Sequence, residues 1–404
     1  MYKRQALEAG GPYQLQIIGK ENQISIKDIL IGDVWLCSGQ SNMQWVVNNV
    51  TNAEVEKKNA NYPQIRTLNI PRRMELSPKD TISATWLVCS PENVGRFSGV
   101  AYFFAKKVYE ETNIPIGIIN SSWGGTIVET WTSLEAANTL PQKRLDRYNK
   151  NEKLFPPTEY LTRKNKEAKR NDYPSLVYNA MIHPLLSFSI KGVLWYQGEN
   201  NVGNAEPYTD WLTCMIGDWR NRWNSELPFY IIQLPNFDSI NKKPLWAEMR
   251  DAQSKVLAVP GTHLIVTSDL GDPYDLHPRN KQEVGMRAAL QALHYEYGYS
   301  DIVSESPMFE RMEINGDKVI ITFKNTGSSL EIRSRYGCLQ GFAIAGEDKK
   351  FHWALGELKD NRIVIWSPKV PNPVAVRYNW ENNPDGNLYN KDGLPACLFR
   401  TDNW

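Results

Sequence analysis

The sequence has few of the residues on which metal, redox and disulfide-rich proteins depend. Five of its 404 residues are cysteine, at positions 37, 89, 214, 338 and 397, and no two of them form a C-x-x-C pair. The five histidines are scattered, without the H-x-x-x-H spacing of a metal-binding helix. We therefore expect no metal site and no cofactor, and the cysteine count would allow one or two disulfide bridges.

Long apolar runs and an excess of one charge are missing as well. No apolar stretch reaches the ~20 residues that a membrane-spanning helix needs. The opening residues, Met-Tyr-Lys-Arg-Gln, lead into no apolar core of a signal peptide. Lys and Arg together number 46, against 45 for Asp and Glu, which gives a formal net charge of +1. We expect neither a membrane span nor a nucleic-acid partner, and the composition does not indicate an oligomeric state.

Aromatic residues, in contrast, are numerous. The chain has 14 Trp and 19 Tyr. Large rings fill protein cores, and their faces also stack on sugar rings. A carbohydrate ligand would therefore find many contact residues here, although core packing explains most of them equally well.

The middle of the chain has the pattern of a parallel α/β domain. A length of 404 residues exceeds the usual size of one core, so two or three domains are expected. Apolar runs rich in β-branched residues begin near residues 34, 116, 192, 229 and 263, with helical sequence between them. This alternation predicts a three-layer α/β/α fold with a parallel sheet of about five strands over residues 31–302.

One segment of this domain differs in composition. Residues 140–172 are the least apolar part of the chain and are dense in Lys and Arg. This composition predicts a solvated helical insertion or lid. Attraction of an anionic glycan is the alternative interpretation of the same charges.

Both ends of the chain have the pattern of β structure. Tyr13 to Ile18 and Gln23 to Ile26 alternate apolar and polar residues around a turn, which predicts a hairpin within residues 1–30. Residues 303–404 contain several such runs, beginning with a hairpin around Asn315-Gly316-Asp317, and predict an all-β accessory module. We expect the two β regions to pair into one sandwich that supports the fold. Carbohydrate binding is the alternative role for the module.

The candidate nucleophile lies on a turn that follows a predicted strand. Residues 33–45 read Asp-Val-Trp-Leu-Cys-Ser-Gly-Gln-Ser-Asn-Met-Gln-Trp, so a buried strand is followed by small and polar residues. Ligands bind at the carboxyl edge of parallel sheets, where such a turn would lie. Ser41 is therefore the candidate nucleophile. In isolation, a serine in this setting is more typical of a turn or a helix cap.

A base for Ser41 is present far downstream. A serine hydroxyl becomes a good nucleophile only when a base takes its proton, and that base needs a group that holds its tautomer. His277 follows an apolar run and has Asp275 and Asp272 nearby. The order Ser, Asp, His differs from the orders in chymotrypsin-like and subtilisin-like proteases. Ser41 also lacks the Gly-x-Ser-x-Gly elbow of α/β-hydrolases, because Met43 stands where the second Gly would be.

Four short blocks resemble those of the SGNH hydrolase superfamily. They are Gly39-Gln40-Ser41-Asn42-Met43, Trp123-Gly124-Gly125-Thr126, Trp195-Tyr196-Gln197-Gly198-Glu199 and Asp275-Leu276-His277-Pro278. They occur in the order of that superfamily, over about residues 30–300. The residues of these blocks are most similar to those of the sialate O-acetylesterase branch, which is similar in turn to plant and microbial carbohydrate acetylesterases. The resemblance implies a flavodoxin-like fold and a serine esterase.

The resemblance also implies roles for individual residues. It makes Ser41 the nucleophile and His277 the base, and it gives the oxyanion to the backbone amides of Ser41 and Gly125 and to the side chain of Gln197. Six further residues in or next to these blocks are expected to contact the substrate or to support these groups: Gln40, Asn42, Trp123, Gly124, Glu199 and Asn200. The expected substrate is an O-acetylated sugar, and sialic acid is the sugar that the resemblance favours. The alternatives are an acetylesterase for xylan or another plant glycan, and a glycan-binding protein without catalysis.

The acid of the expected triad departs from the pattern. The superfamily places Asp three residues before the histidine, and Tyr274 occupies that position here. Asp275 is the favoured replacement by position, and Asp272 is the alternative. Adjacent-but-one side chains diverge in extended backbone, so a Ser-His dyad steered by a backbone carbonyl or by Asp272 also stays open.

The resemblance finally bears on the start of the chain. In the sialate esterase branch, a longer β domain usually precedes the nucleophile block, and residues 1–30 resemble the last piece of such a domain. We therefore expect a chain that lacks its natural start. A periplasmic or secreted location would follow from the resemblance in that case.

Overall fold

The computed structural model describes residues 7–146, 158, 173–238, 243 and 245–404. Its largest sheet has seven strands in the order β5-β4-β6-β3-β7-β8-β9, all parallel except β5, which is antiparallel to β4. The strands are β3 (Asp33–Gly39), β4 (Tyr62–Asn69), β5 (Trp86–Cys89), β6 (Ile116–Ser122), β7 (Gly192–Tyr196), β8 (Phe229–Ile232) and β9 (Thr262–Ile265). Strand β3, which leads to Ser41, therefore lies at the centre of the sheet.

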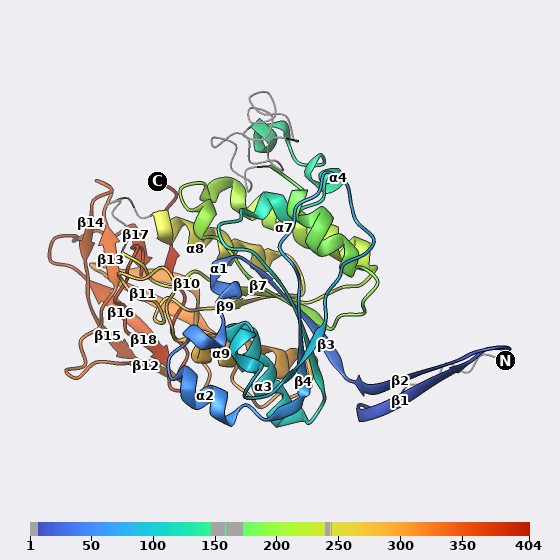
Figure 1. The fold of residues 1–404 in the computed structure, drawn as a ribbon. Helices are drawn as coiled ribbons and strands as arrows, with labels where there is room; N and C mark the ends of the chain where they lie inside the picture. Colours follow the sequence, from blue (N-terminus) through green and yellow to red (C-terminus); the bar gives the residue numbers. More distant parts are fainter. Residues whose placement is uncertain (1–6, 147–157, 159–172, 239–242, 244) are drawn as a thin grey trace.

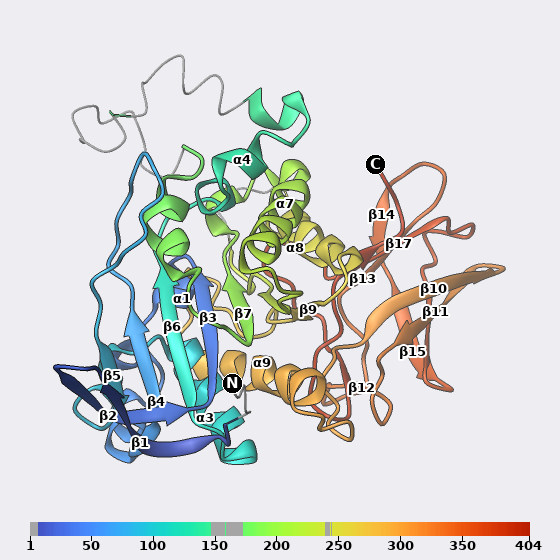
Figure 2. The same cartoon turned by 90° about the vertical axis from the view of Figure 1, so that its right-hand side faces the viewer.

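Helices cover both faces of this sheet (Figures 1 and 2). The main helices are α3 (Gly99–Thr112) and α9 (Lys281–Glu296) on one face and α7 (Ala205–Trp223) and α8 (Leu245–Lys255) on the other. Trp35 and Cys37 pack with α3 and α9, whereas Leu36 packs with α7 and α8. Because the sheet is buried on both faces, its strands are apolar along their length instead of alternating. The predicted three-layer α/β/α fold is confirmed.

Short helical segments connect these elements. They are α1 (Ser41–Gln44), α2 (Ala53–Asn59) and α4 (Leu134–Ala137), the 3₁₀ segments η1 (Val47–Asn49), η2 (Val94–Arg96), η3 (Val128–Trp131), η5 (His183–Leu185), η6 (Glu199–Asn201) and η7 (Val256–Ala258), and the π-helical segment η4 (Tyr178–Ile182). Two of them, α1 and η6, begin within three residues of the carboxyl ends of β3 and β7. They place side chains at one edge of the sheet.

The sheet has two strands more than the five that the sequence predicts. The missed strands are β4 and its antiparallel neighbour β5. Strand β4 contains Pro63, Gln64 and Arg66, and its exposed and buried residues do not form one apolar run. Strand β5 is the edge strand and has only four residues, and β4 lies next to it, so neither strand gives a clear hydrophobic pattern in the sequence.

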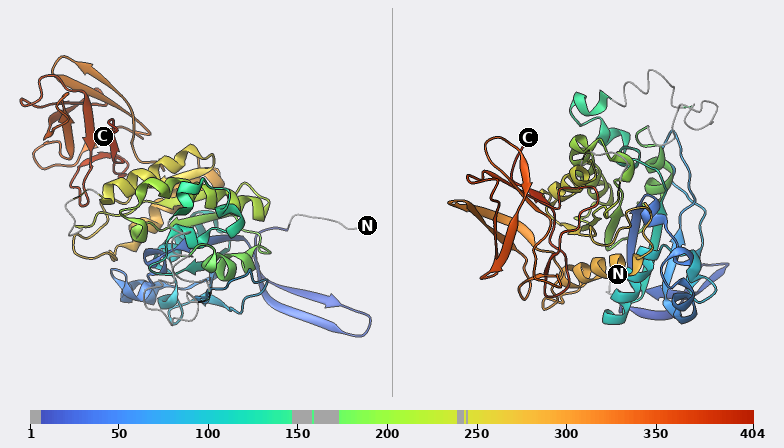
Figure 3. Two further views of the ribbon diagram at one scale, coloured as in Figure 1. Left: turned by 90° about the horizontal axis from the view of Figure 1, so that it is seen from above. Right: turned by 90° about the vertical axis from the view of Figure 1, so that its left-hand side faces the viewer.

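The N-terminal hairpin does not join the C-terminal β structure, so the predicted sandwich is wrong. Among the described strands, β1 (Gly10–Ile18) and β2 (Gln23–Ile31) pair only with each other. The hairpin projects from the α/β body, and the seven-stranded sheet lies between it and the C-terminal strands (Figures 1 and 3). The predicted hairpin itself is confirmed.

The C-terminal strands form what we call the β module, residues 308–400. One sheet has the order β10-β11-β16-β15, a second β14-β13-β17-β19, and a third pairs β12 with β18. The strands are β10 (Met308–Asn315), β11 (Lys318–Lys324), β12 (Leu330–Ile332), β13 (Phe342–Ala345), β14 (Phe351–Trp353), β15 (Leu355–Lys359), β16 (Arg362–Trp366), β17 (Ala375–Tyr378), β18 (Leu388–Asn390) and β19 (Phe399–Arg400). Their inward residues form one core. The predicted hairpin around Gly316 is confirmed, because Asn315 pairs with Lys318.

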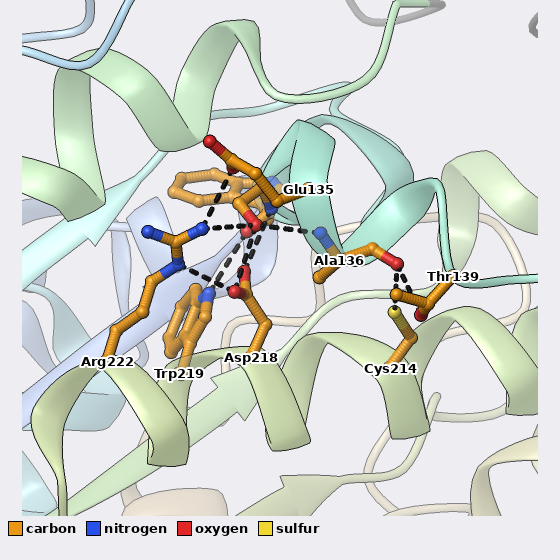
Figure 4. Close-up of polar contacts among 9 residues, drawn as sticks. Glu135, Ala136, Thr139, Cys214, Asp218, Trp219 and Arg222 are labelled. Atoms are coloured by element: carbon orange, nitrogen blue, oxygen red, sulfur yellow. Dashed lines mark hydrogen bonds and ion pairs between the residues drawn. The ribbon is translucent and has the colours of Figure 1, made fainter.

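A polar cluster fastens α4 to α7 next to the predicted charged insertion (Figure 4). Asp218 on α7 accepts hydrogen bonds from the backbone and the hydroxyl of Ser133, the N-cap of α4, at 3.0 and 2.9 Å. Arg222 pairs with Asp218 at 2.7 Å and with Glu135 at 2.9 Å. Most of the insertion predicted at residues 140–172 lies outside the described residues.

The sequence also predicts no membrane span, and it predicts domain boundaries at residues 30 and 302. Within the described ranges, we find no helix with the length and apolar character that crossing a membrane requires. The predicted boundaries at residues 30 and 302 stay a prediction. The fold brings the carboxyl ends of the central strands to one edge, which is where the four sequence blocks lie.

Candidate active site

The central strands bring three of the sequence blocks together. Gly39, the last residue of β3, pairs with Ser122 at the end of β6 on one side and with Tyr196 at the end of β7 on the other. The loops that leave these strands therefore start at the same level of the sheet. Gly39 has φ +135°, and a Cβ there would lie 2.1 Å from the carbonyl oxygen of Tyr196. Only glycine fits this close approach of the strands.

The fourth block completes a contact between the two expected catalytic side chains. His277 lies in the loop between β9 and α9, and its Nε2 is 2.8 Å from Ser41 Oγ. These residues are 236 positions apart in the chain. A hydroxyl at this distance from an imidazole nitrogen can pass its proton to it. The structure thus brings Ser41 and His277 together in the geometry that the sequence predicts.

The glycine loop after β6 lies directly against the serine. A Cβ on Gly124 would be 3.2 Å from Ser41 Cβ, so a side chain there would crowd the hydroxyl. The backbone amide of Gly124 donates to Gln44 Oε1 at 2.8 Å. Gly125 follows with φ +75°. Within the described part of the chain, no group accepts a hydrogen bond from the amides of Ser41 and Gly125, which leaves both available to a ligand oxygen.

Gln197 has a different environment from the one expected. Its side chain is fully buried, and Nε2 donates to Gln40 Oε1 at 3.2 Å, Thr126 O at 3.0 Å and Asn201 Oδ1 at 2.8 Å. The two N–H groups of an amide are already used by these three internal acceptors. The direct donation of Gln197 to an oxyanion stays a prediction, and it would require one of these internal hydrogen bonds to open. In this arrangement, Gln197 ties the glycine loop to the nucleophile turn.

Asn42, next to the nucleophile, joins three distant segments. Its Nδ2 donates to Glu199 Oε1 at 2.5 Å and to the carbonyl of Leu276 at 3.1 Å. Its Oδ1 accepts a hydrogen bond from Lys281 Nζ at 2.6 Å. Asn42 and Lys281 have no exposed surface. One buried amide therefore connects the serine turn, the Glu199 turn and both sides of His277, and we call this set the Asn42 cluster.

Burial governs the charges around His277. It lowers the pKa of the Lys281 ammonium to about 7, although Glu199 and Asp275 act in the opposite direction. It raises the pKa of Glu199, which the hydrogen bond from Asn42 and the charge of Lys281 partly offset. The pKa of His277 is lowered by burial and then by Lys281, against a smaller effect of Asp275. The lowered pKa of His277 favours a neutral imidazole near neutral pH, and a neutral imidazole can act as a base.

The structure brings neither candidate acid to the imidazole. Asp275 Oδ1 accepts a hydrogen bond from the backbone amide of His277 at 2.8 Å, and Asp272 Oδ1 accepts one from the amide of Tyr274 at 2.8 Å. Among the described residues, no carboxylate forms a hydrogen bond or an ion pair with the ring of His277. Trp45 stacks on this ring instead, with centroids 4.9 Å apart and an interplanar angle of 7°.

The other residues expected near the substrate take part in building the turns. Gln40 Oε1 accepts hydrogen bonds from the amides of Gly198 and Asn200, at 3.4 and 3.3 Å. The amide of Trp123 donates to the carbonyl of Gly39 at 3.0 Å. These contacts fix the backbone around Ser41.

Sequence reasoning missed two residues of the site, Lys281 and Trp45. Lys281 opens α9 four residues after His277, and Trp45 lies one turn after Ser41. Their proximity to the two motifs is the signal that could have drawn attention to them. Their residue types gave no further indication, because lysine at a helix start and tryptophan near a core are both common.

The His, Cys, Asp and Glu residues of the described structure also bear on metal binding and on disulfide formation. Within residues 7–146, 158, 173–238, 243 and 245–404, no group of three or more His, Cys, Asp or Glu side chains could hold a metal ion. All five cysteines are unpaired. The contact between Ser41 and His277 can support acyl transfer through a serine, with an imidazole as base.

Comparisons with known proteins agree with this chemistry. A family model described as carbohydrate esterase, sialic acid-specific acetylesterase matches residues 31–294. The sialate O-acetylesterase of Homo sapiens is 32% identical over 353 residues, which cover 78% of this chain and 64% of the human protein. The sialate O-acetylesterase of Mus musculus is 31% identical over 94% of this chain and 78% of the mouse protein. The chain thus spans less than two thirds of the length of the human relative.

A solved structure is similar along nearly the whole chain. The crystal structure of a carbohydrate acetylesterase from Xanthomonas citri superposes with a TM-score of 0.88 at 39% sequence identity. The superposition covers 99% of this chain and 87% of the other. The similarity therefore includes the β module as well as the α/β sheet.

Proposed function

Because the chain belongs to the sialic acid-specific acetylesterase family of carbohydrate esterases, we propose that it is a serine esterase that removes O-acetyl groups from sialic acid. The observation that carries this proposal is the 2.8 Å contact between His277 Nε2 and Ser41 Oγ beside the glycine loop. The fold alone would not carry it, because one fold supports many activities. The contact supplies the nucleophile and the base that ester cleavage needs.

The first half of the reaction forms an acetyl-serine. His277 Nε2 takes the proton of Ser41 Oγ while the oxygen attacks the acetyl carbonyl. The backbone amides of Ser41 and Gly125 stabilise the negative oxygen of the tetrahedral intermediate. The C–O bond to the sugar then breaks, and the protonated His277 returns its proton to the sugar oxygen. The deacetylated sugar leaves.

The second half regenerates the enzyme. His277 takes a proton from a water molecule, which attacks the acetyl group on Ser41. The same two amides stabilise the second tetrahedral intermediate. Acetate leaves as Ser41 Oγ recovers the proton from His277. Each step uses only the groups that the fold brings together.

For the orientation of His277, we favour a Ser-His dyad over a triad. The imidazole is held between Ser41 and the ring of Trp45, and Asp275 stabilises the turn through the backbone. Asp275 as the third member, or Asp272 in its place, stays the alternative. A triad acid would need to turn its carboxylate from a backbone amide toward the ring.

The sugar defines the second candidate function. Acetylated xylan or another plant glycan would be the substrate instead of sialic acid, with the same chemistry. The similarity to the carbohydrate acetylesterase from Xanthomonas citri, at 39% identity, is the observation that favours it. The third alternative, glycan binding without catalysis, is disfavoured by the intact pair of Ser41 and His277.

An acetate-release panel tests the proposal. The purified protein is incubated with 9-O-acetylated sialic acid, acetylated xylan and a simple aryl acetate, with the Ser41→Ala variant as the blank. We expect release from the aryl acetate and from the sialic acid, and none above the spontaneous rate from the variant. Release from xylan without release from sialic acid would select the second candidate. No release from any ester would leave only the binding function.

A further inference from the structure

A cavity lies on the β module, away from Ser41. It has a volume of about 600 Å³ and opens between β14, the loop after β16 and the segment after β17. Its walls include Ala343, Phe351, Trp353, Lys369, Trp380 and Glu381. Figure 1 shows β13, β14 and β17 side by side on this part of the module. None of these residues belongs to the acyl-transfer site.

The register of the sheet explains why a hollow forms here. Ala343 on β13 pairs with Trp353 on β14 and with Arg377 on β17. Residues paired across strands point to the same face. Ile344, the next residue, points to the opposite face and is fully buried in the core of the module. A methyl group between two large side chains leaves an open floor, and the cavity lies above it.

The aromatic wall is fixed by charged groups. Arg377 lies over the ring of Phe351 at 4.0 Å and over Trp380 at 5.6 Å. Its guanidinium is held in turn by two hydrogen bonds to Asp402, at 2.8 and 2.7 Å. Cation–π contacts and a bidentate ion pair both restrict side-chain rotation. The wall therefore has its shape before any ligand binds, which lowers the entropy that binding loses.

Three side chains of the cavity could contact a ligand: Trp353, Glu381 and Lys369. Trp353 is 62% exposed, and among the described residues no other ring or cation stacks on it. The carboxylate of Glu381 forms no hydrogen bond or ion pair with a described residue, and its pKa is raised by burial and then by Asp385. Lys369 also lines the cavity. Lys369 and Glu381 bring opposite charges to the cavity, and the charge of Arg377 in its wall is paired with Asp402.

This combination matches the chemistry of a sugar. A pyranose ring has an apolar C–H face that packs on an indole and an edge of hydroxyl groups that need donors and acceptors. Trp353 offers the indole face, and Glu381 and Lys369 offer the acceptor and the donor. An acidic sugar would meet the unpaired carboxylate of Glu381. A neutral saccharide therefore fits the cavity best.

The cavity is also connected to the loops of the acyl-transfer site. Trp380 and Glu381 in its wall are followed by Asn383, which accepts a hydrogen bond from Asn236 Nδ2 at 2.7 Å. Asn236 Oδ1 accepts one from the amide of Gly271 at 2.6 Å, in the loop that carries His277. The wall of the cavity and the histidine loop are thus joined through two side chains.

We propose that the cavity on the β module is a non-catalytic binding site for neutral saccharide chains, with Trp353 as its stacking platform. The site goes beyond the proposed esterase function, because it binds sugar residues that carry no ester. It would hold the protein on a glycan while the distant serine acts on acetylated positions. Its existence does not require that the serine be active.

Direct titration tests the site independently of catalysis. Tryptophan fluorescence and calorimetry are followed while the whole protein is titrated with de-O-acetylated cello-, xylo- and manno-oligosaccharides, and with sialyllactose as an acidic sugar. We expect at least one neutral oligosaccharide to bind, and Trp353→Ala to weaken it by about tenfold or more, as the loss of an aromatic anchor does. Glu381→Gln should weaken it less. These probes carry no acetyl ester, so the outcome is independent of turnover on an aryl acetate.

A matched control removes another tryptophan of the same region. Trp404 is 41% exposed, lies under Lys349 at 5.0 Å and does not line the cavity. Trp404→Ala should leave saccharide affinity unchanged, and thermal unfolding of both variants checks that the module folds. Three results would overturn the proposal: no neutral oligosaccharide binds, only sialyllactose binds, or Trp353→Ala binds as tightly as the parent protein.

Discussion

The two partners of the central contact are held in different ways. The turn of Ser41 is fixed on all sides: strand β3 lies in the middle of the sheet, Gly124 lies against the serine, and Asn42 is anchored by buried hydrogen bonds. Among the described residues, the ring of His277 is held by the hydroxyl of Ser41 and the face of Trp45. The Ser41 turn is thus fixed by many contacts, whereas the orientation of the His277 ring depends on one stacking contact.

In the dyad that we propose, the base is oriented without a carboxylate on its ring. A triad acid holds the tautomer of the histidine and stabilises the imidazolium that forms during attack. Here the stack with Trp45 fixes the plane of the ring, and the turn around Asp275 fixes its backbone. Lys281 and burial keep the imidazole neutral before the reaction. The Asn42 cluster connects the two sides, so the serine side also positions the histidine.

The largest expected effect removes the loosely held partner. His277→Ala should lower kcat by on the order of 10⁶-fold, as loss of the base does in a serine hydrolase. Because the ring is held mainly by stacking, added imidazole should occupy the vacated place against Trp45 and restore part of the activity. Acetate release with and without imidazole measures both effects. Failure of imidazole to rescue His277→Ala, or equal rescue when Trp45 is also replaced by Ala, would show that the stack does not hold the ring.

The next effect concerns the connection between the two sides. Lys281→Met should destabilise the protein by roughly 3 kcal/mol, because Glu199 and Asn42 lose a buried charged partner. It should also raise the pKa of His277, since Lys281 lowers it, so the acid limb of the pH profile of kcat/KM should move to higher pH. Denaturant unfolding and the pH profile measure the two results.

The control for Lys281 is a lysine that lies on the surface. Lys255 pairs with Asp251 at 2.6 Å and its side chain is 57% exposed. Lys255→Met should change stability by less than about 1 kcal/mol and leave the pH profile in place. A Lys281→Met protein with an unchanged acid limb would contradict the role of the ammonium at His277.

A smaller effect tests the stack itself. Trp45→Ala should lower kcat by roughly two- to thirteenfold, which corresponds to the ~0.5 to 1.5 kcal/mol of an aromatic pair. Trp45→Phe should restore most of the activity, because a smaller ring can still stack on His277. The substrate KM should change less than kcat, since the ring acts through the base. Equal kcat values for Trp45→Ala and the parent protein would remove Trp45 from the account.

The smallest effect separates the dyad from the triad. Asp275→Asn keeps an oxygen that can accept the hydrogen bond from the amide of His277, so we expect kcat to fall by less than about tenfold. Asp272→Asn should behave in the same way. If either aspartate is the acid of a triad, its replacement should lower kcat by about 10⁴-fold instead. Acetate release by the two variants, measured side by side, decides between these outcomes.

Much of the fold and of the site could be predicted from the sequence. Ser41 and His277 could be paired because each follows an apolar strand, and parallel strands place their carboxyl ends at one edge. The glycines after β6 could be assigned to the same edge for this reason. The hairpin around Gly316 was equally clear, since its turn residues have a defined geometry.

Other features depend on packing that a linear pattern does not express. Strand β4 mixes polar and apolar residues and β5 is only four residues long, so neither has a clear strand pattern, and pairing with neighbours in the sheet defines them. The partner of the N-terminal hairpin was predicted wrongly, because alternation shows that a strand has two faces but not which sheet it meets. The internal hydrogen bonds of Gln197 and the contacts of Lys281 arise where three loops meet. Motif spacing carries no information about them.

The most direct test of the central claim is the rate of acetate release by Ser41→Ala. The account predicts that this variant folds normally, with a circular dichroism spectrum like that of the parent protein, and releases no acetate above the spontaneous rate from an aryl acetate or an O-acetylated sugar. A correctly folded Ser41→Ala protein that releases acetate as fast as the parent protein would contradict the claim that this hydroxyl and His277 form the reactive pair.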